Sequence, residues 1–331
     1  MSSYDLAVIG AGSAGFSAAI TAAEQGAHVA LIGHGTIGGT CVNVGCVPSK
    51  TMIRATEALH QANTGRFAGI QASGQLADWG AIVGQKDELV ASLRQSKYTD
   101  QLENYPSIDY RPGAAAFNGD GLLFDGAPLA AEKTVIACGS QASVPDIAGI
   151  KDTPFLTSTT AFALEQLPGS ILLIGGGYIG CEVAQMLARA GVAVTIACRS
   201  RLLPEGEPEI SDALRGYLRD EGLTVMDGLS YESIERTGTG VALRVETDGA
   251  AQVLQAERLL LSAGRRPNTQ GLGLEQAGIK TRANGGIAID ERMRTSRANV
   301  YAAGDVTGRD QFVYMAAHGA KIAAQNALNG D

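Results

Sequence analysis

The clearest pattern along the chain is an unbroken apolar run that leads into a glycine-rich turn and then into a helical stretch. The run covers Leu6–Ile9 and is typical of a strand buried within a parallel sheet. The turn covers Gly10–Gly15, and an alanine-rich helical stretch then continues to about Gln25. His28–Ile32 has the composition of the next strand. This order predicts a strand–helix–strand unit.

The same order of elements occurs a second time, in the latter half of the chain. A strand-like run covers Ile171–Ile174, and the glycine-rich turn that follows it covers Gly175–Gly180. A helical run then reaches about Ala190, and Val192–Ala197 is the next expected strand. Two such units predict an α/β protein with two Rossmann-like dinucleotide-binding domains.

Each glycine of these turns has a physical task. The first permits a tight turn, the second lets the backbone approach a pyrophosphate, and the third lets the helix pack on the strand. The N-terminus of the helix adds free N–H groups and a partial positive charge. The alternative is that both turns are only structural. The three glycines are Gly10, Gly12 and Gly15 in the first turn, and Gly175, Gly177 and Gly180 in the second.

Turn-rich segments mark the expected domain limits. Ser143–Gly149 precedes the second unit, and Arg265–Thr269 follows it. We therefore expect the second dinucleotide-binding domain, 150–266, to be inserted into the first, which would comprise 1–149 and 267–331.

A pair of cysteines follows the first unit. Cys41 and Cys46 would lie about 8–9 Å apart on a regular helix, whereas a disulfide needs Cα atoms within about 7 Å. A redox pair would therefore require local unwinding, which Gly45 makes easy. Pro48 suits a helix that begins near Cys46, where the partial charge of the helix and Lys50 would lower the thiol pKa. The alternative is two buried structural thiols.

Composition excludes several classes of protein. The net charge of −8 argues against nucleic acid or an anionic membrane as partner, and no apolar run reaches the ~18 residues of a membrane span. Five cysteines are too few for a secreted disulfide scaffold, so we expect a cytoplasmic protein. The other three, Cys138, Cys181 and Cys198, are expected to be core thiols.

The end of the second strand of the second unit bears on the choice of nucleotide. Arg199 and Arg201 stand where a carboxylate would bind the ribose of NADH, and two arginines suit the 2′-phosphate of NADPH. The alternative is two solvated surface arginines. Two dinucleotide sites and a dithiol also imply a flavin, because flavin accepts a hydride and reacts with thiolates.

Together these motifs resemble the pyridine nucleotide–disulfide oxidoreductases, and within that family the mercuric reductases. The resemblance covers essentially the whole chain and is carried by Leu31–Lys50, Arg292–Ser296 and Gln311–Tyr314. It implies FAD at the first turn, NADPH at the second, and a homodimer formed by a C-terminal interface domain that we expect to be absent here. The implied cofactor-binding residues are Gly10, Gly12, Ala14, Gly15, Gly39, Thr40, Lys50, Gly139, Gly175, Gly177, Gly180, Arg199, Arg201, Gly264, Gly304 and Asp305.

The resemblance also implies roles for five catalytic residues. Cys46 would be the thiolate against the flavin, and Cys41 the exchange thiol that faces the substrate. Lys50 would pair with Glu182 near the flavin, and Tyr178 would cover the flavin face until the nicotinamide displaces it.

The implied reaction passes electrons from NADPH through FAD to Cys41–Cys46, which would bind Hg(II) for reduction to Hg(0). The chemistry suits the metal, because a soft cation prefers thiolate ligands. Two alternatives stay open: reduction of a low-molecular-weight or lipoyl disulfide, and a truncated FAD- or metal-binding module without catalytic activity.

Overall fold

The computed structural model describes residues 3–65 and 67–330. Contacts divide the chain into two compact units. Unit 1 comprises 1–46, 89–141 and 265–331, and unit 2 comprises 47–88 and 142–264. The compact units are defined by contacts, whereas the limits expected from the sequence are those of nucleotide-binding domains. Those expected limits therefore stay a prediction.

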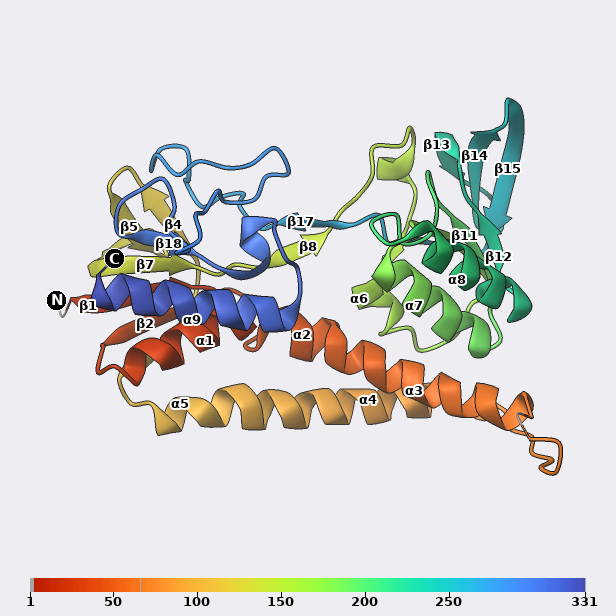
Figure 1. Ribbon diagram of the computed structural model, residues 1–331, viewed down its shortest axis with the longest axis horizontal. Helices are drawn as coiled ribbons and strands as arrows, with labels where there is room; N and C mark the ends of the chain where they lie inside the picture. Colours follow the sequence, from red (N-terminus) through yellow and green to blue (C-terminus); the bar gives the residue numbers. More distant parts are fainter. Residues whose placement is uncertain (1–2, 66, 331) are drawn as a thin grey trace. The chain divides into compact units, whose positions relative to one another are not determined.

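Unit 1 is built on a five-stranded parallel sheet in the order β18-β7-β1-β2-β3. Helices α1 (Ser13–Ala23) and α9 (Val313–Asn329) lie side by side on it (Figure 1). The strands are β1 (Tyr4–Ile9), β2 (Val29–Gly33), β3 (Ile108–Pro112), β7 (Ala131–Ile136) and β18 (Val300–Ala302).

The apolar run of β1 follows from its position in the middle of this sheet. Leu6 and Val8 are fully buried in the cluster that contains α1 and α9, while Ala7 and Ile9 pack into a separate cluster. Successive side chains of a strand point to opposite faces. Both faces of β1 are therefore covered, which explains why its sequence does not alternate.

Shorter elements complete unit 1. Two small sheets are formed, one by β4-β5-β6 and one by β17-β8. These elements are α2 (Gly39–Val44), the π-helix η1 (Gln95–Thr99), α5 (Asp100–Asn104), β4 (Ala115–Asn118), β5 (Gly121–Phe124), β6 (Ala127–Leu129), β8 (Ser140–Ala142), β17 (Arg265–Pro267) and the 3₁₀ helix η3 (Gly304–Thr307). Helices α3 (Cys46–Asn63) and α4 (Trp79–Arg94) run across the boundary between the units.

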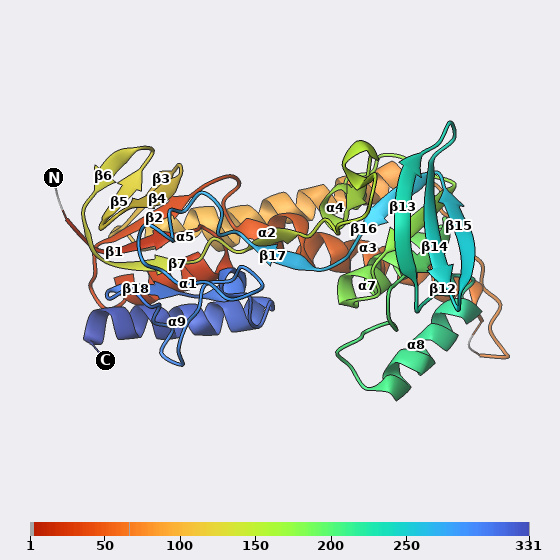
Figure 2. The same ribbon diagram turned by 90° about the horizontal axis from the view of Figure 1, so that it is seen from above.

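Unit 2 is built on a second five-stranded parallel sheet, in the order β12-β11-β10-β16-β9. An antiparallel sheet, β13-β14-β15, accompanies it (Figure 2). The elements are η2 (Ile150–Asp152), β9 (Leu156–Thr157), α6 (Ser158–Ala161), β10 (Ser170–Ile174), α7 (Tyr178–Arg189), β11 (Ala193–Ala197), α8 (Pro208–Asp220), β12 (Thr224–Met226), β13 (Ser230–Arg236), β14 (Val241–Thr247), β15 (Ala250–Ala256) and β16 (Arg258–Leu261).

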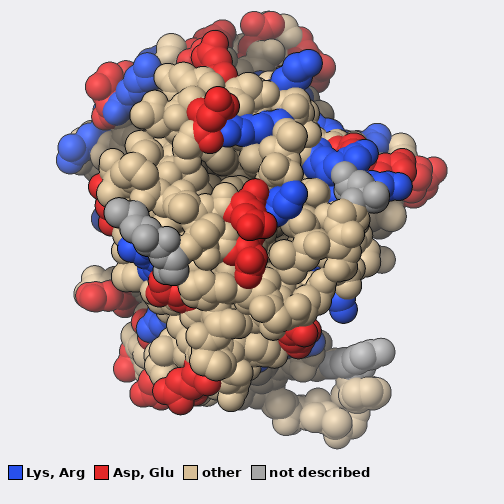
Figure 3. Space-filling model, turned by 90° about the vertical axis from the view of Figure 1, so that its left-hand side faces the viewer, with Lys and Arg blue, Asp and Glu red and all other residues tan. Residues whose placement is uncertain are grey.

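The structure confirms the α/β class and both strand–helix–strand units expected from the sequence. In each unit the first strand pairs with the second in parallel, with Leu6 opposite Val29 and Ile171 opposite Val194. No helix within the described ranges is long and apolar enough to cross a membrane. On the face drawn in Figure 3, acidic and basic side chains are interspersed among uncharged ones.

Candidate functional site

The first glycine turn is held by close backbone contacts. Gly10 has a φ of +120°, and a Cβ there would lie 2.2 Å from the carbonyl oxygen of Ala137. A Cβ on Gly15 would lie 1.6 Å from the carbonyl oxygen of Gly10. Gly12 is different, because the nearest atom to its Cβ position is the Cα of Gly39, at 3.5 Å. The first and third glycines are therefore needed by the fold, whereas the second has room for a ligand.

The second turn repeats this arrangement. Gly175 has a φ of +119°, and its Cβ would lie 2.2 Å from the carbonyl oxygen of Ser262. A Cβ on Gly180 would lie 2.5 Å from the carbonyl oxygen of Gly175. Around Gly177 no described atom lies within 4 Å of the Cβ position. Both turns thus keep open the glycine that the sequence assigns to pyrophosphate approach.

The cysteine segment breaks where the sequence predicts. Helix α2 ends at Val44, Gly45 has φ −120° and ψ −111°, and α3 begins at Cys46. A Cβ on Gly45 would lie only 2.9 Å from the carbonyl oxygen of Thr40. The break therefore brings α2 and the start of α3 closer together than a side chain would allow, and this confirms the expected unwinding.

The redox segment is fixed to the first glycine turn through the start of α2. Gly38 forms a β-bridge with Gly12, and a Cβ on Gly39 would lie 2.6 Å from the Cα of Gly12. Unit 1 therefore places the dithiol segment directly beside the candidate pyrophosphate loop. Thr40 follows Gly39 on the first turn of α2 and is exposed.

Cys41 and Cys46 are both thiols, and their side chains interact with each other. The hydrogen bond with Cys46 raises the pKa of Cys41 far above its ordinary value, and burial and the charge of a Cys46 thiolate raise it further. The positive charge of Lys97 opposes this shift only weakly. Cys41 therefore keeps its proton while Cys46 is charged.

Tyr98 is a neighbour of this pair that the sequence analysis missed. It lies on the π-helix η1, its hydroxyl is 3.2 Å from the Ser13 hydroxyl, and its ring stands edge-on to Phe16. Burial raises the pKa of Tyr98, and thiolate charge on Cys41 and Cys46 adds to the effect. No motif marks Tyr98 in the sequence, but a π-helix is frequent at functional sites.

A second group of residues surrounds Asp305 at the start of η3. The Ser140 hydroxyl donates to the Asp305 carboxylate at 2.6 Å, and Arg265 Nε donates to the Ser140 hydroxyl oxygen at 2.8 Å. Burial lowers the pKa of Arg265, against the effect of Asp305 and Cys46. Gly304 meets Ala14 of the first turn, with 3.1 Å between its Cβ position and the Ala14 Cβ.

Ser140 and Arg265 were not among the expected site residues. The sequence marked Arg265 only as part of a domain breakpoint, and Ser140 stands directly after Gly139 without a motif of its own. Gly139 has a φ of +71° and Gly264 a φ of +97°, and the Cβ position of each is open within the described residues.

Unit 2 contains the predicted ion pair. Lys50 Nζ donates to both carboxylate oxygens of Glu182 at 2.5 Å. The side chains are 57% and 43% exposed, so the pair contributes about 1 kcal/mol or less to stability. Tyr178 begins α7 and is 56% exposed.

The two arginines after β11 differ in their surroundings. The Arg199 guanidinium lies 6.0 Å from the ring centre of Tyr231. Arg201 donates to the Gly206 carbonyl at 2.6 Å and to the Pro204 carbonyl at 3.3 Å. Its Nε is buried and has no hydrogen-bond partner within residues 3–65 and 67–330.

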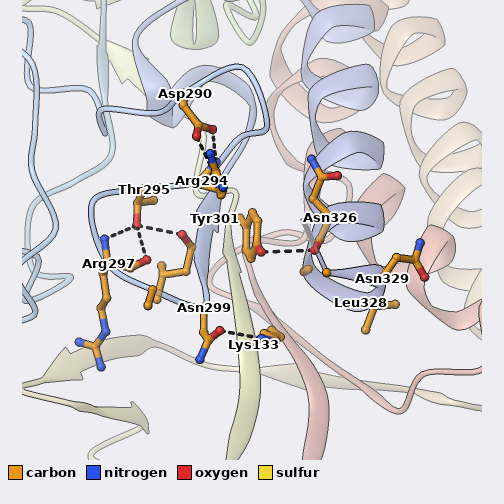
Figure 4. Close-up of a pocket in the computed structure, with 14 residues that line it drawn as sticks. Lys133, Asp290, Arg294, Thr295, Arg297, Asn299, Tyr301, Asn326, Leu328 and Asn329 are labelled. Carbon is orange, nitrogen blue, oxygen red and sulfur yellow. Dashed lines mark hydrogen bonds and ion pairs between the residues drawn. The ribbon is translucent and has the colours of Figure 1, made fainter.

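The pocket in Figure 4 has a volume of about 790 Å³ and contains none of the expected site residues. Residues of the β18 region and the end of α9 line it, including Arg294, Tyr301 and Asn326. Its polar groups bond to one another: Asp290 accepts from Arg294, and the Tyr301 hydroxyl donates to the Asn326 carbonyl. We therefore assign it no part in the chemistry.

Comparison with known proteins gives consistent results. A family model described as pyridine nucleotide-disulphide oxidoreductase matches residues 4–324. A mercuric reductase of Staphylococcus aureus is 44% identical over 327 residues, covering 98% of this chain and 60% of its own length. One of Streptomyces lividans is 44% identical over 335 residues, covering 99% of this chain and 70% of its own.

Among solved structures, the HOCl-induced flavoprotein disulfide reductase RclA from Escherichia coli matches with a TM-score of 0.85 and 34% identity. That match covers 99% of this chain and 72% of the other. This chain therefore spans about 60% of the Staphylococcus aureus relative and about 72% of RclA. The family match over residues 4–324, which is nearly the whole chain, shows that the chain belongs to the pyridine nucleotide–disulphide oxidoreductase family.

Proposed function

We propose that this chain passes electrons from NADPH through FAD to the Cys41–Cys46 pair, and that Hg(II) bound by the pair is reduced to Hg(0). The observation that carries the proposal is the placement of two interacting thiols on a broken helix beside an open glycine turn. The identity with mercuric reductases, 44% in two of them, supports mercury as substrate.

The first turn fits FAD. The open Cβ position of Gly12 leaves room for a pyrophosphate beside the N-terminus of α1. Asp305 follows Gly304, which packs against Ala14 of the first turn. The Asp305 carboxylate accepts a hydrogen bond from Ser140, which orients it to receive a ribityl hydroxyl. When bound, the flavin would supply the two-electron chemistry that links hydride acceptance to reduction of a cysteine disulfide.

The second turn fits the pyridine nucleotide. Gly177 is open, and α7 begins directly after it. The buried Nε of Arg201 lacks an acceptor among the described residues, and a 2′-phosphate would supply one. This donor supports NADPH over NADH.

The thiols have distinct tasks in this proposal. Cys46 carries the negative charge, while the raised pKa of Cys41 keeps a proton on the second sulfur until a metal displaces it. The balance is NADPH plus Hg²⁺ giving NADP⁺, H⁺ and Hg⁰. The half-buried Arg265 offsets charge near Cys46 without donating a proton, because guanidinium stays protonated.

An anaerobic absorbance experiment tests the proposal. NADPH should bleach the flavin band, and stoichiometric Hg(II) should restore it with release of volatile mercury and with one NADPH oxidised for each Hg(II) reduced. The Cys46→Ser variant should still be bleached but not restored by Hg(II), whereas Cys138→Ser should behave like the unchanged chain. Bleaching without recovery in the unchanged chain would refute mercury reduction and leave the cofactor assignment standing.

A second candidate function is reduction of a small disulfide. The solved structure of RclA, 34% identical, is named a flavoprotein disulfide reductase, and this favours it. The same experiment with oxidised glutathione or lipoamide in place of Hg(II) separates the two, because only the true substrate restores the flavin band within one turnover.

A further inference from the structure

Two further cysteines lie against the second glycine turn, in unit 2. The Cys181 thiol donates to the Gly176 carbonyl oxygen, with 3.6 Å between sulfur and oxygen. The Cys198 sulfur lies 3.2 Å from the position that a Cβ on Gly176 would occupy. The residues are 7% and 4% exposed and belong to one hydrophobic cluster. One peptide of the candidate nucleotide loop is therefore packed against two thiols.

The elements explain this juxtaposition. Cys181 lies on the first turn of α7, and Cys198 directly follows β11. The first strand–helix–strand unit has Phe16 and His34 at the corresponding places, one residue after its third glycine and one residue after its second strand. The thiol pair is thus a feature of the second turn alone. The Cys198 sulfur also lies 3.0 Å from the Ser200 carbonyl oxygen and 3.6 Å from the Met226 carbonyl oxygen, both of which are acceptors for its thiol hydrogen.

We propose that Cys181 and Cys198 form a second site for a soft thiophilic cation, such as Hg(II), and that its occupation distorts the Gly175–Gly177 loop. Two sulfurs suffice, because a soft cation of this kind takes two thiolates in a linear array, as at Cys41–Cys46. Binding forms two metal–sulfur bonds, breaks two S–H bonds and releases two protons, with no electron transferred.

The distortion follows from the packing. The Cβ position of Gly176 lies 3.1 Å from Leu202, in addition to its contact with Cys198. The Gly176 peptide therefore has no free space on the side that faces these two residues. In the proposed site, a metal bound to each sulfur at about 2.3 Å or more lies against this peptide, and we expect its loading to shift Gly176. Burial raises the pKa of Cys181 to about 11 and that of Cys198 to about 12, so the metal must compete with two protons and local opening. Loading should consequently be slower than at the exposed Cys46.

Distortion of the Gly175–Gly177 loop should weaken NADPH binding. That effect on NADPH rests on the proposed function, but the metal site itself does not. The test starts from the Cys41→Ala/Cys46→Ala variant, which lacks the redox pair. One equivalent of Hg(II) should be retained per chain in native mass spectrometry after removal of loosely bound metal. Adding Cys181→Ala and Cys198→Ala should abolish retention, whereas adding Cys138→Ala should not.

NADPH binding provides the second readout. In the Cys41→Ala/Cys46→Ala variant, Hg(II) should raise the Kd for NADPH by about tenfold or more, and the quadruple variant should show no change. Thermal unfolding and NADPH binding without metal check that the quadruple variant is folded. No retained metal, or retention that survives loss of Cys181 and Cys198, would overturn the site. If NADPH fails to bind even without metal, the proposed function falls, and the mercury count alone decides the metal site.

Discussion

The contrast between Gly15 and Gly12 yields a sharp prediction. A Cβ on Gly15 must open its distance to the Gly10 carbonyl oxygen from 1.6 Å to at least 3.0 Å, and neither backbone can rotate away. Overpacking of this kind costs about 1–3 kcal/mol, and a backbone clash belongs at the upper end. At about 2.1 cal/mol/K of unfolding entropy per residue, about 3 kcal/mol corresponds to a fall in Tm of roughly 4 °C for a chain of 331 residues.

Gly12→Ala provides the matched control. Gly12 has φ −93° and ψ −167°, which alanine adopts without strain, and the nearest atom to the added methyl would lie at 3.5 Å. We therefore expect Gly12→Ala to leave the stability of the apoprotein within about 0.5 kcal/mol of the unchanged chain. It should nevertheless lose FAD, because the methyl group occupies the space into which a pyrophosphate would fit.

The assay compares thermal unfolding of flavin-free protein with the FAD content of the reconstituted protein. Gly15→Ala should lose both stability and FAD, and Gly12→Ala only FAD. If Gly15→Ala melts within about 2 °C of the unchanged chain, the packing argument is wrong. If Gly12→Ala binds FAD normally, the first turn is not the pyrophosphate site.

Three further predictions concern the thiol pair and an acidic group. Cys46→Ala should abolish any long-wavelength charge-transfer band from the thiolate to the flavin in the absorption spectrum of the reconstituted protein. Gly45→Ala should slow disulfide formation in a thiol titration, because its Cβ would lie 2.9 Å from the Thr40 carbonyl oxygen and push α2 away from α3; an unchanged rate contradicts this. Burial would raise the pKa of Glu221, but its hydrogen bonds and ion pair with Arg189 lower that pKa below 4.5. The stability that the Glu221–Arg189 pair contributes is therefore complete above pH 4.5 and is lost as the pH falls through the pKa of Glu221 in the folded state. Arg189→Gln should cost about 2 kcal/mol in urea unfolding at neutral pH and less below about pH 4, and an equal cost at both would refute the linkage.

Local sequence determined the parts of this protein that depend on backbone geometry. The apolar runs predicted β1 and β10, and the glycine spacing predicted where strand passes into helix. The break at Gly45 followed from the length of a helical repeat and the reach of a disulfide. Each of these follows from sterics within a few consecutive residues, so a single sequence contains the information.

Tertiary structure alone decided which distant residues meet. Tyr98 reaches the cysteine pair from a π-helix, and Arg265 joins Ser140 and Asp305 across a long separation in sequence. Cys181 and Cys198 have the sequence pattern of ordinary core thiols. Cys181 meets Gly176 within its own turn of chain, but only the pairing of β10 with β11 sets Cys198 against the same residue. Such contacts depend on strand order and helix packing, which are set by burial over the whole fold and leave no periodic signal in the residues concerned.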